Sequence, residues 1–283
     1  MKNLPSDVSC NFNGDVNGDA DAAQNVINNV ANNPAKFDDK DDVFGRIAGR
    51  YDFLCDVFSF SIHRLWKQKV AKIINDEPWQ QLLDVGSGTG DIVYRLLKSP
   101  SLSRPMSISI KDNLPNRSII VSDISSKMLQ IAKHKLKSHE ADPAINMSFM
   151  TLNAQAMKEI ASSSQDVVAV SLVLKICDRQ AVLKEAYRVL KPGGRVVILE
   201  ASNIPIAWLH QLYLCYMSIV MPMIGWLATG GDSSAYKYLL QGVKNFPSAE
   251  ELQSEIEQIG FERVQWQRLS LGIIAIHYGY KDA

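Results

Sequence analysis

The sequence predicts an α/β protein with a doubly wound, mostly parallel sheet. Two observations carry this prediction. Short apolar runs alternate with segments whose apolar residues recur at helical spacing. The first of these runs leads directly into a glycine-rich turn, Gly86 to Gly90, and then into a helical segment. Strands that alternate with helices are joined by crossovers, which make the strands parallel and place helices on the faces of the sheet.

Five apolar runs are the expected parallel strands: QLLDV, SIIVSD, MSFMTLNA, SQDVVAVSLVL and RVVILEAS. The expected helices between them include DIVYRLLKS, SSKMLQIAKHKLKS and RQAVLKEAYRVL, and we expect the Pro-Gly-Gly sequence at 192–194 to break the chain before the fifth strand. Near the C-terminus, FERVQWQRLS and LGIIAIHYGYK alternate apolar and polar residues across a short link. This pattern predicts an antiparallel hairpin at the edge of the sheet.

The chain divides into a tail and one domain. Residues 1–36 contain nine Asn, four Asp and one aromatic residue, a composition that predicts disorder. From Phe37 onward, apolar residues at helical spacing predict two or three helices before the first strand. The single domain, 37–283, is therefore divided into N-terminal helices (37–80), a core (81–200), an apolar helical insertion (201–246) and a closing helix with the hairpin (247–283).

Composition excludes several classes of function. Thirty basic and thirty acidic residues give no net charge, so the chain lacks the basic excess that a nucleic-acid partner requires. Its four cysteines form no CxxC pair and join no histidine cluster, so no metal site is predicted and the thiols are expected to be reduced. The first residues lack an apolar signal segment. These features predict a cytoplasmic protein.

Residues 201–231 contain no Asp, Glu, Lys or Arg, and the run is long enough to consider a membrane-spanning helix. His210, Gln211 and Pro222 disfavour spanning, and we expect Pro222 to break the helix near its middle. The segment is instead expected to fold as helices over the active site, with peripheral membrane contact through 204–228. The alternative is that these are ordinary core helices without a ligand role.

The glycine-rich turn carries the first functional signal. Gly86, Gly88 and Gly90 are spaced as GxGxG rather than as the dinucleotide GxGxxG, and Asp84 precedes them. Glycines allow a sharp turn and a close approach of the backbone to a ligand. An acid at this place would repel a pyrophosphate but suits a cationic ligand without phosphate. We predict that Asp84, Ser87 and the glycines bind S-adenosylmethionine.

Polar residues at the ends of the later strands complete a predicted nucleoside site. Asp123 ends the second strand, where its carboxylate would accept hydrogen bonds from ribose hydroxyls. The alternative reading makes Asp123 the N-cap of the following helix. Asn153 and Ala154 follow the third strand, and Ser171 lies near the end of the fourth. All of them fall at the edge where open α/β sheets bind ligands.

With these residues in place, a family resemblance is visible. LLDVGSGTGD, IIVSDIS, LNAQAM and YRVLKPGGRVVILE resemble the Rossmann-like class I S-adenosylmethionine-dependent methyltransferases. YDFLCDVFSFSIHRLWK, GDSSAYKYLLQGVKNFPSAEEL and GIIAIHYGYK resemble the ubiquinone and menaquinone C-methyltransferases, over about residues 43–281. The resemblance implies cofactor contacts at Thr89, Asp123, Asn153, Ala154 and Ser171. It also implies C-methylation of a lipophilic phenol or quinol.

Departures from the family fall on the acceptor side. VLKICD places Lys175 and Ile176 where the family has Arg and Asn, and Cys55 stands in place of Asn. Arg and Lys are not interchangeable where a planar donor fork is needed. Ser234 and Ala235 replace an acid and a serine. Two alternatives therefore remain open: a diverged small-molecule O- or N-methyltransferase, and a non-catalytic member that binds the cofactor.

Methylation of a ring carbon needs a base, or a cation that stabilises phenolate. The candidates are His63, Arg64, Lys175 and Tyr236. The alternative roles are surface ion pairs for Arg64 and Lys175, and a solvent-facing hydroxyl for Tyr236. A homodimer is a further expectation. The matrix side of the mitochondrial inner membrane is the alternative to a cytoplasmic location.

Overall fold

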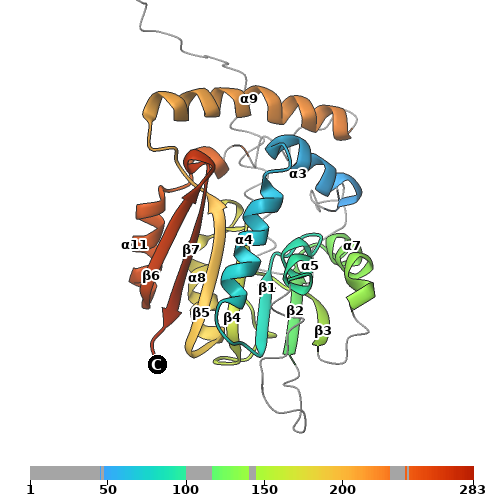
Figure 1. Ribbon diagram of the computed structural model, residues 1–283, viewed down its shortest axis with the longest axis vertical. Coiled ribbons are helices and arrows are strands. Elements are labelled where there is room, and N and C mark those ends of the chain that lie inside the picture. Colours follow the sequence, from blue (N-terminus) through green and yellow to red (C-terminus); the bar gives the residue numbers. More distant parts are fainter. Residues whose placement is uncertain (1–44, 46–47, 100–116, 140–144, 230–239, 241) are drawn as a thin grey trace, which may run out of the picture.

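The computed structural model describes residues 45, 48–99, 117–139, 145–229, 240 and 242–283. Within these ranges one sheet has the strand order β3-β2-β1-β4-β5-β7-β6 (Figure 1). Its strands are β1 (Gln81–Val85), β2 (Arg117–Asp123), β3 (Ile145–Thr151), β4 (Gln165–Ser171), β5 (Leu190–Ala201), β6 (Phe261–Leu269) and β7 (Ile274–Lys281). β1 to β5 pair in parallel, and β7 pairs antiparallel with both β5 and β6. The predicted parallel sheet and edge hairpin are confirmed.

Helices connect the strands and extend the domain at both ends. The α-helices with described bounds are α3 (Tyr51–Ser59), α4 (His63–Asn75), α5 (Asp91–Leu97), α7 (Ser126–Leu136), α8 (Arg179–Val189), α9 (Ala207–Thr229) and α11 (Ala249–Ile259). Short 3₁₀ turns are η2 (Ala48–Arg50), η3 (Lys137–His139), η4 (Leu174–Ile176) and η5 (Ser270–Gly272). The expected helices before the first strand are therefore present. The predicted disordered tail, 1–36, lies outside the described residues.

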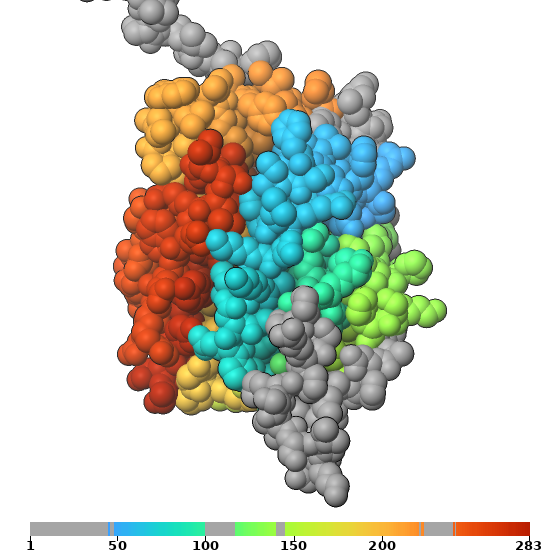
Figure 2. Space-filling view, viewed as in Figure 1, coloured from blue at the N-terminus to red at the C-terminus, as the bar shows by residue number. Residues whose placement is uncertain are grey.

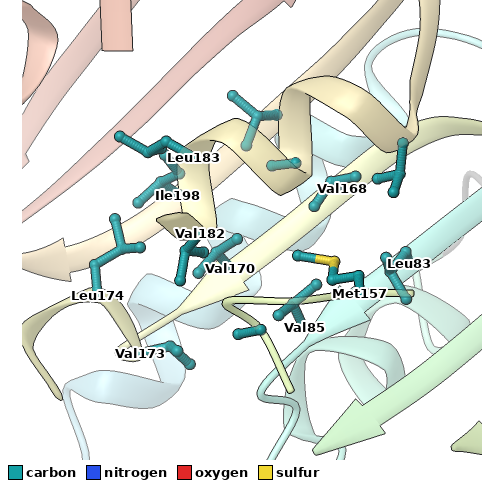
Figure 3. Close-up of a cluster of buried hydrophobic side chains, with 14 of the residues drawn as sticks. Leu83, Val85, Met157, Val168, Val170, Val173, Leu174, Val182, Leu183 and Ile198 are labelled. Atoms are coloured by element: carbon teal, nitrogen blue, oxygen red, sulfur yellow. The ribbon is translucent and has the colours of Figure 1, made fainter. Parts of the chain in front are cut away.

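The sheet has a buried apolar layer on each face because successive strand residues point to opposite sides. In β1, Leu83 faces α8 and α11 while its neighbour Leu82 faces α4, α5 and α7. Figure 3 shows the first of these layers, where β4 side chains such as Val168 and Val170 meet Val182 of α8. Strands buried on both faces require nearly continuous apolar runs, which the sequence supplies.

Two predicted breaks are wrong. β5 begins at Leu190 and runs through the Pro-Gly-Gly sequence. Between the pairs Gln165↔Leu190 and Val167↔Arg195 the register shifts, so the extra β5 residues form a bulge that absorbs the proline and glycines. Helix α9 likewise continues through Pro222. Proline removes one helical hydrogen bond, but the N–H groups of the residues on either side can continue the ladder.

Helix α9 lies across one end of the molecule (Figure 1). It follows β5, whose carboxyl end points toward it, and it packs against α3. Over 207–229 the apolar insertion is therefore helical, and this helix covers the edge where the predicted site residues gather. In the described ranges we find no helix with the combined length and apolar character that crossing a bilayer demands.

Candidate active site

The glycine-rich turn joins β1 to α5 at the carboxyl edge of the sheet. Gly86 has a φ of +63°, which L side chains rarely adopt. A Cβ at this position would lie 2.2 Å from Cγ2 of Val173, in the segment after β4. Both the backbone conformation and the close approach of this neighbouring segment therefore require glycine at position 86.

Asp123, at the end of β2, binds the glycine turn directly. Its Oδ2 accepts a hydrogen bond from the N–H of Gly88 at 2.8 Å, and its Oδ1 accepts one from the N–H of Ser125 at 2.9 Å. The N-cap of α7 is Ser125, whose Oγ accepts from the N–H of Met128. The alternative reading of Asp123 as the N-cap is therefore wrong, because the hydroxyl two residues later takes that role.

Four of the predicted cofactor residues carry buried polar atoms that lack hydrogen-bond partners among the described residues. These atoms are both carboxylate oxygens of Asp84, Oγ of Ser87, Nδ2 of Asn153 and Oγ of Ser171. Buried polar groups are nearly always paired in folded proteins, so such a cluster indicates a ligand. The set offers anionic acceptors, hydroxyls and an amide donor, which fits the ammonium, sulfonium and adenosine groups of S-adenosylmethionine.

Asp84 is the deepest of these residues, with no solvent exposure. Burial raises the pKa of Asp84 to about 8, and the nearby carboxylates of Asp123 and Asp91 add to this rise, whereas the Lys67 ammonium opposes it. A positively charged ligand beside this carboxyl group would stabilise its ionised form. The electrostatics therefore agree with the predicted cationic ligand.

Helix α3 packs on the glycine turn through Tyr51 and Asp52, which the sequence motifs did not predict as site residues. The hydroxyl group of Thr89 donates a hydrogen bond to Oδ1 of Asp52 at 2.6 Å, and Nζ of Lys135 donates one to Oγ1 of Thr89 at 3.0 Å. A Cβ on Gly88 would lie 3.9 Å from Cε1 of Tyr51. Tyr51 and Asp52 are the first two residues of YDFLCDV, a segment that carries the family resemblance. Their place in this segment was the signal by which the sequence could have identified them.

A second polar cluster lies beside this contact. Lys67 forms an ion pair with Asp91 at 3.2 Å, and Arg95 and Lys135 approach the same carboxylate. Burial favours a higher pKa for Asp91, but these three cations outweigh it and hold the pKa at about 2. A neighbouring cavity of about 400 Å³ is lined by Asp52, Asp91, Arg95, Lys135 and other polar residues. Its lining includes none of the four residues with unpaired atoms, so this cavity is not the predicted cofactor site.

The side chain of Lys175 is only 9% exposed, and its charge is paired. It lies in η4, just beyond β4, and its Nζ donates to Oε1 of Glu200 at 3.0 Å. Glu200 is almost fully buried near the end of β5 and also accepts hydrogen bonds from the N–H groups of Lys175 and Ala201. The alternative role of Lys175 in a surface ion pair is wrong, because the pair is buried between two strand ends.

His63 and Arg64 lie together at the start of α4. Ser59 donates its hydroxyl hydrogen to the carbonyl of Cys55 at 2.6 Å, so Nδ1 of His63 must donate to Oγ of Ser59 at 2.8 Å. Burial lowers the pKa of His63 to about 4, with the Lys67 ammonium as the second cause. Such an imidazole is neutral at pH 7 and a weak base.

Arg64 is exposed and paired with Asp56, which is the surface ion pair given above as its alternative role. Tyr236 lies outside the described residues.

A parallel sheet with an antiparallel final hairpin, a glycine turn after β1 and an acid after β2 define a class I S-adenosylmethionine-dependent methyltransferase. Solved structures agree on the fold. A SAM-dependent methyltransferase from Thermotoga maritima matches with a TM-score of 0.53 and 19% identity, over 84% of this chain and 98% of that chain. The carbon methyltransferase of CurJ matches with a TM-score of 0.51 and 18% identity, over 77% and 54%.

The chain belongs to the ubiE/COQ5 methyltransferase family, whose model matches residues 32–281. It is 35% identical over 240 residues to the ubiquinone/menaquinone biosynthesis C-methyltransferase UbiE of Paracoccus denitrificans, covering 84% of this chain and 89% of that protein. It is 33% identical to the mitochondrial 2-methoxy-6-polyprenyl-1,4-benzoquinol methylase of Oryza sativa, covering 84% and 82%. The protein is thus a methyltransferase with S-adenosylmethionine as its methyl donor.

Proposed function

We propose that this enzyme methylates a ring carbon of a lipophilic phenol or quinol, such as a precursor of ubiquinone or menaquinone. The similarity to C-methyltransferases of quinone biosynthesis over 84% of the chain is the observation that carries this proposal. A charge-free helix over the carboxyl edge of the sheet, with Met217 buried in it, supports an apolar acceptor.

S-adenosylmethionine supplies an activated methyl group, and we propose that Asp84, Ser87, Asp123, Asn153 and Ser171 hold it at the sheet edge. The protein must then place the acceptor carbon in line with that methyl group and favour the phenolate form of the acceptor. Lys175 is the candidate cation for this task. Its Nζ already donates to the carbonyl of Leu172 and to Oε1 of Glu200, so we assign to Lys175 a role in orienting the acceptor oxygen through its remaining N–H rather than in removing a proton.

The acceptor is tested by supplying labelled S-adenosylmethionine with a panel of phenols and naphthoquinols that differ only in tail length. Each buried methylene contributes up to about 0.8 kcal/mol, so acceptor affinity should rise with tail length until the apolar site is full. Mass spectrometry of the products should place the label on a ring carbon. A flat length series in a cofactor-binding protein would refute the lipophilic acceptor and favour a small-molecule O- or N-methyltransferase.

Two substitutions on α9 provide a matched test. Met217 is only 8% exposed, whereas Ile219 is 61% exposed on the same helix. In detergent solution, Met217→Lys should weaken long-tailed acceptors more than short ones, because it places a charge on the buried face of α9. Ile219→Lys should leave the affinities for both the long-tailed and the short-tailed acceptors unchanged. Equal effects on long and short acceptors would contradict an apolar acceptor site beneath α9, provided that the thermal shift with S-adenosylmethionine is retained.

The cellular location is also a proposal. We place the enzyme in the cytoplasm, with the matrix side of the mitochondrial inner membrane as the alternative. Fractionation of cells that express the full chain distinguishes the two locations.

A further inference from the structure

The described part of the chain exposes its large apolar side chains at one end only. They belong to three segments: the corner between α3 and α4, helix α9 with the residue before it, and η5. We call this set the apolar cap, and its members are Phe53, Phe60, Ile62, Leu65, Ile206, Trp208, Leu212, Tyr216, Ile219, Met223 and Leu271. Single exposed apolar residues are normal on protein surfaces, but a contiguous group marks an interaction site.

Helix α9 contributes a continuous stripe to the apolar cap. Trp208, Leu212, Tyr216, Ile219 and Met223 follow one another at intervals of three or four residues, which places them on one face of a helix. Trp208 is 70% exposed. The buried face of α9 packs toward α3, so the helix has an apolar side toward the protein and a second apolar side toward solvent.

The other two segments lie beside α9 and are joined to each other. Figures 1 and 2 show α9 running across the end of the molecule, with α3 and η5 next to it. Nε1 of Trp66 in α4 donates to Oγ of Ser270 in η5 at 2.9 Å, which fixes the α4 segment to the turn that carries Leu271. The apolar cap is therefore one surface built from three parts of the chain.

We propose that the apolar cap binds the surface of a lipid bilayer, with α9 lying in the plane of the interface. The choice of lipid rests on the proposed function, because a prenylated acceptor resides in a bilayer. The carboxyl edge of the sheet faces this same end, so docking would bring the site close to the bilayer that holds the acceptor. The stripe includes Trp208 and Tyr216, the side-chain types that concentrate at membrane interfaces. Since residues 201–231 carry no charge, the contact does not require anionic lipid.

Flotation of the full chain with neutral phosphatidylcholine vesicles, without acceptor, tests the proposal. The parent protein should float with the vesicles, and added salt should not release it, because the contact is apolar. The double variant Trp208→Ser/Ile219→Ser should bind on the order of tenfold or more weakly, because it removes two large apolar side chains from the interface. Gln211→Ser, an exposed polar position on the same helix, should bind like the parent. An unchanged thermal shift with S-adenosylmethionine shows that each variant is folded.

The proposal is overturned if the parent fails to float, or if the folded double variant floats as well as the parent. Light scattering in the same buffers measures the oligomeric state, which tests whether a second copy of the chain covers the apolar cap instead. A dimer that the double variant abolishes, together with no vesicle binding, would assign the apolar cap to a second copy of the chain. Methylation of a detergent-dissolved prenylated phenol is measured in parallel. Activity without flotation refutes only the bilayer contact, whereas flotation without that activity refutes the proposed acceptor.

Discussion

Replacing Asp123 by alanine separates the structural role of this residue from its proposed role in binding the cofactor. Its carboxylate accepts hydrogen bonds from the N–H groups of Gly88 and Ser125, at 2.8 and 2.9 Å. Leaving such groups unpaired costs about 1–3 kcal/mol. Because 1 kcal/mol corresponds to about 2–4 °C for a domain of this size, we expect the melting temperature without cofactor to fall by roughly 2–12 °C.

The effect of the cofactor is then measured on top of this loss. At a hundred times its dissociation constant, S-adenosylmethionine should add about 2.7 kcal/mol to the stability of the parent protein. Losing a charged acceptor for a ribose hydroxyl costs about 1.5–3 kcal/mol, which is roughly 10- to 150-fold in affinity. At the same ligand concentration, a tenfold loss leaves about 1.4 kcal/mol and a hundredfold loss about 0.4 kcal/mol. Asp123→Ala should therefore retain at most about half of the parent stabilisation.

Asp166 offers a matched control at the opposite edge of the sheet. Its Oδ2 accepts hydrogen bonds from the N–H groups of Gln80 and Gln81, both at 2.8 Å, so it also binds two backbone donors. Asp166→Ala should lower the melting temperature without cofactor to a similar extent and keep the full stabilisation by S-adenosylmethionine. Differential scanning fluorimetry over a ligand titration measures both effects. A full shift in Asp123→Ala, or an equal loss in Asp166→Ala, would refute the cofactor role of Asp123.

Three further predictions follow from buried contacts. Gly86→Ala should destabilise the domain by more than the ~1–2 kcal/mol that a non-glycine residue costs in the left-handed conformation. Adding Val173→Ala should recover the part of this loss that comes from the clash between the new methyl group and Val173. If the two losses of stability simply add in thermal melts, this contact is not the cause. Burial lowers the pKa of His277 to about 4, below the unfolded value of about 6.5. The contribution of His277 to the free energy of unfolding is therefore complete above pH 6.5 and is lost as the pH falls toward 4. His277→Gln should remove up to about 3 kcal/mol of that acid dependence in urea unfolding, and an unchanged dependence would exclude His277 as its source. Lys175→Met should cost about 3–5 kcal/mol by leaving Glu200 buried and unpaired, and adding Glu200→Leu should restore most of it; no recovery in the double variant would mean that the lost ion pair is not the cause.

The amino-acid sequence was sufficient to predict the fold class, the order of the parallel strands along the chain and the position of the glycine turn. These features depend on local signals: apolar runs for strands, helical spacing for helices, and glycines where the backbone must turn. The residues with unpaired buried atoms were also predictable, because Asp84, Asn153 and Ser171 lie at or just beyond strand ends, and parallel strands bring those ends to one edge. The exceptions were the breaks expected at 192–194 and Pro222. There the local signal was overridden by pairing with β4 and by the continuing helix.

Contacts between side chains that are distant in the sequence became visible in the folded structure alone. Asp52 binds Thr89 across 37 positions of the chain, and Lys175 pairs with Glu200 across 25, distances over which sequence spacing carries no information. His63 has the residue type of a general base, yet burial lowers its pKa to about 4. The direction of the α9 stripe was likewise undetermined, because an apolar helix without charges has no polar face to orient it. Its exposed face follows from the packing of its other side against α3.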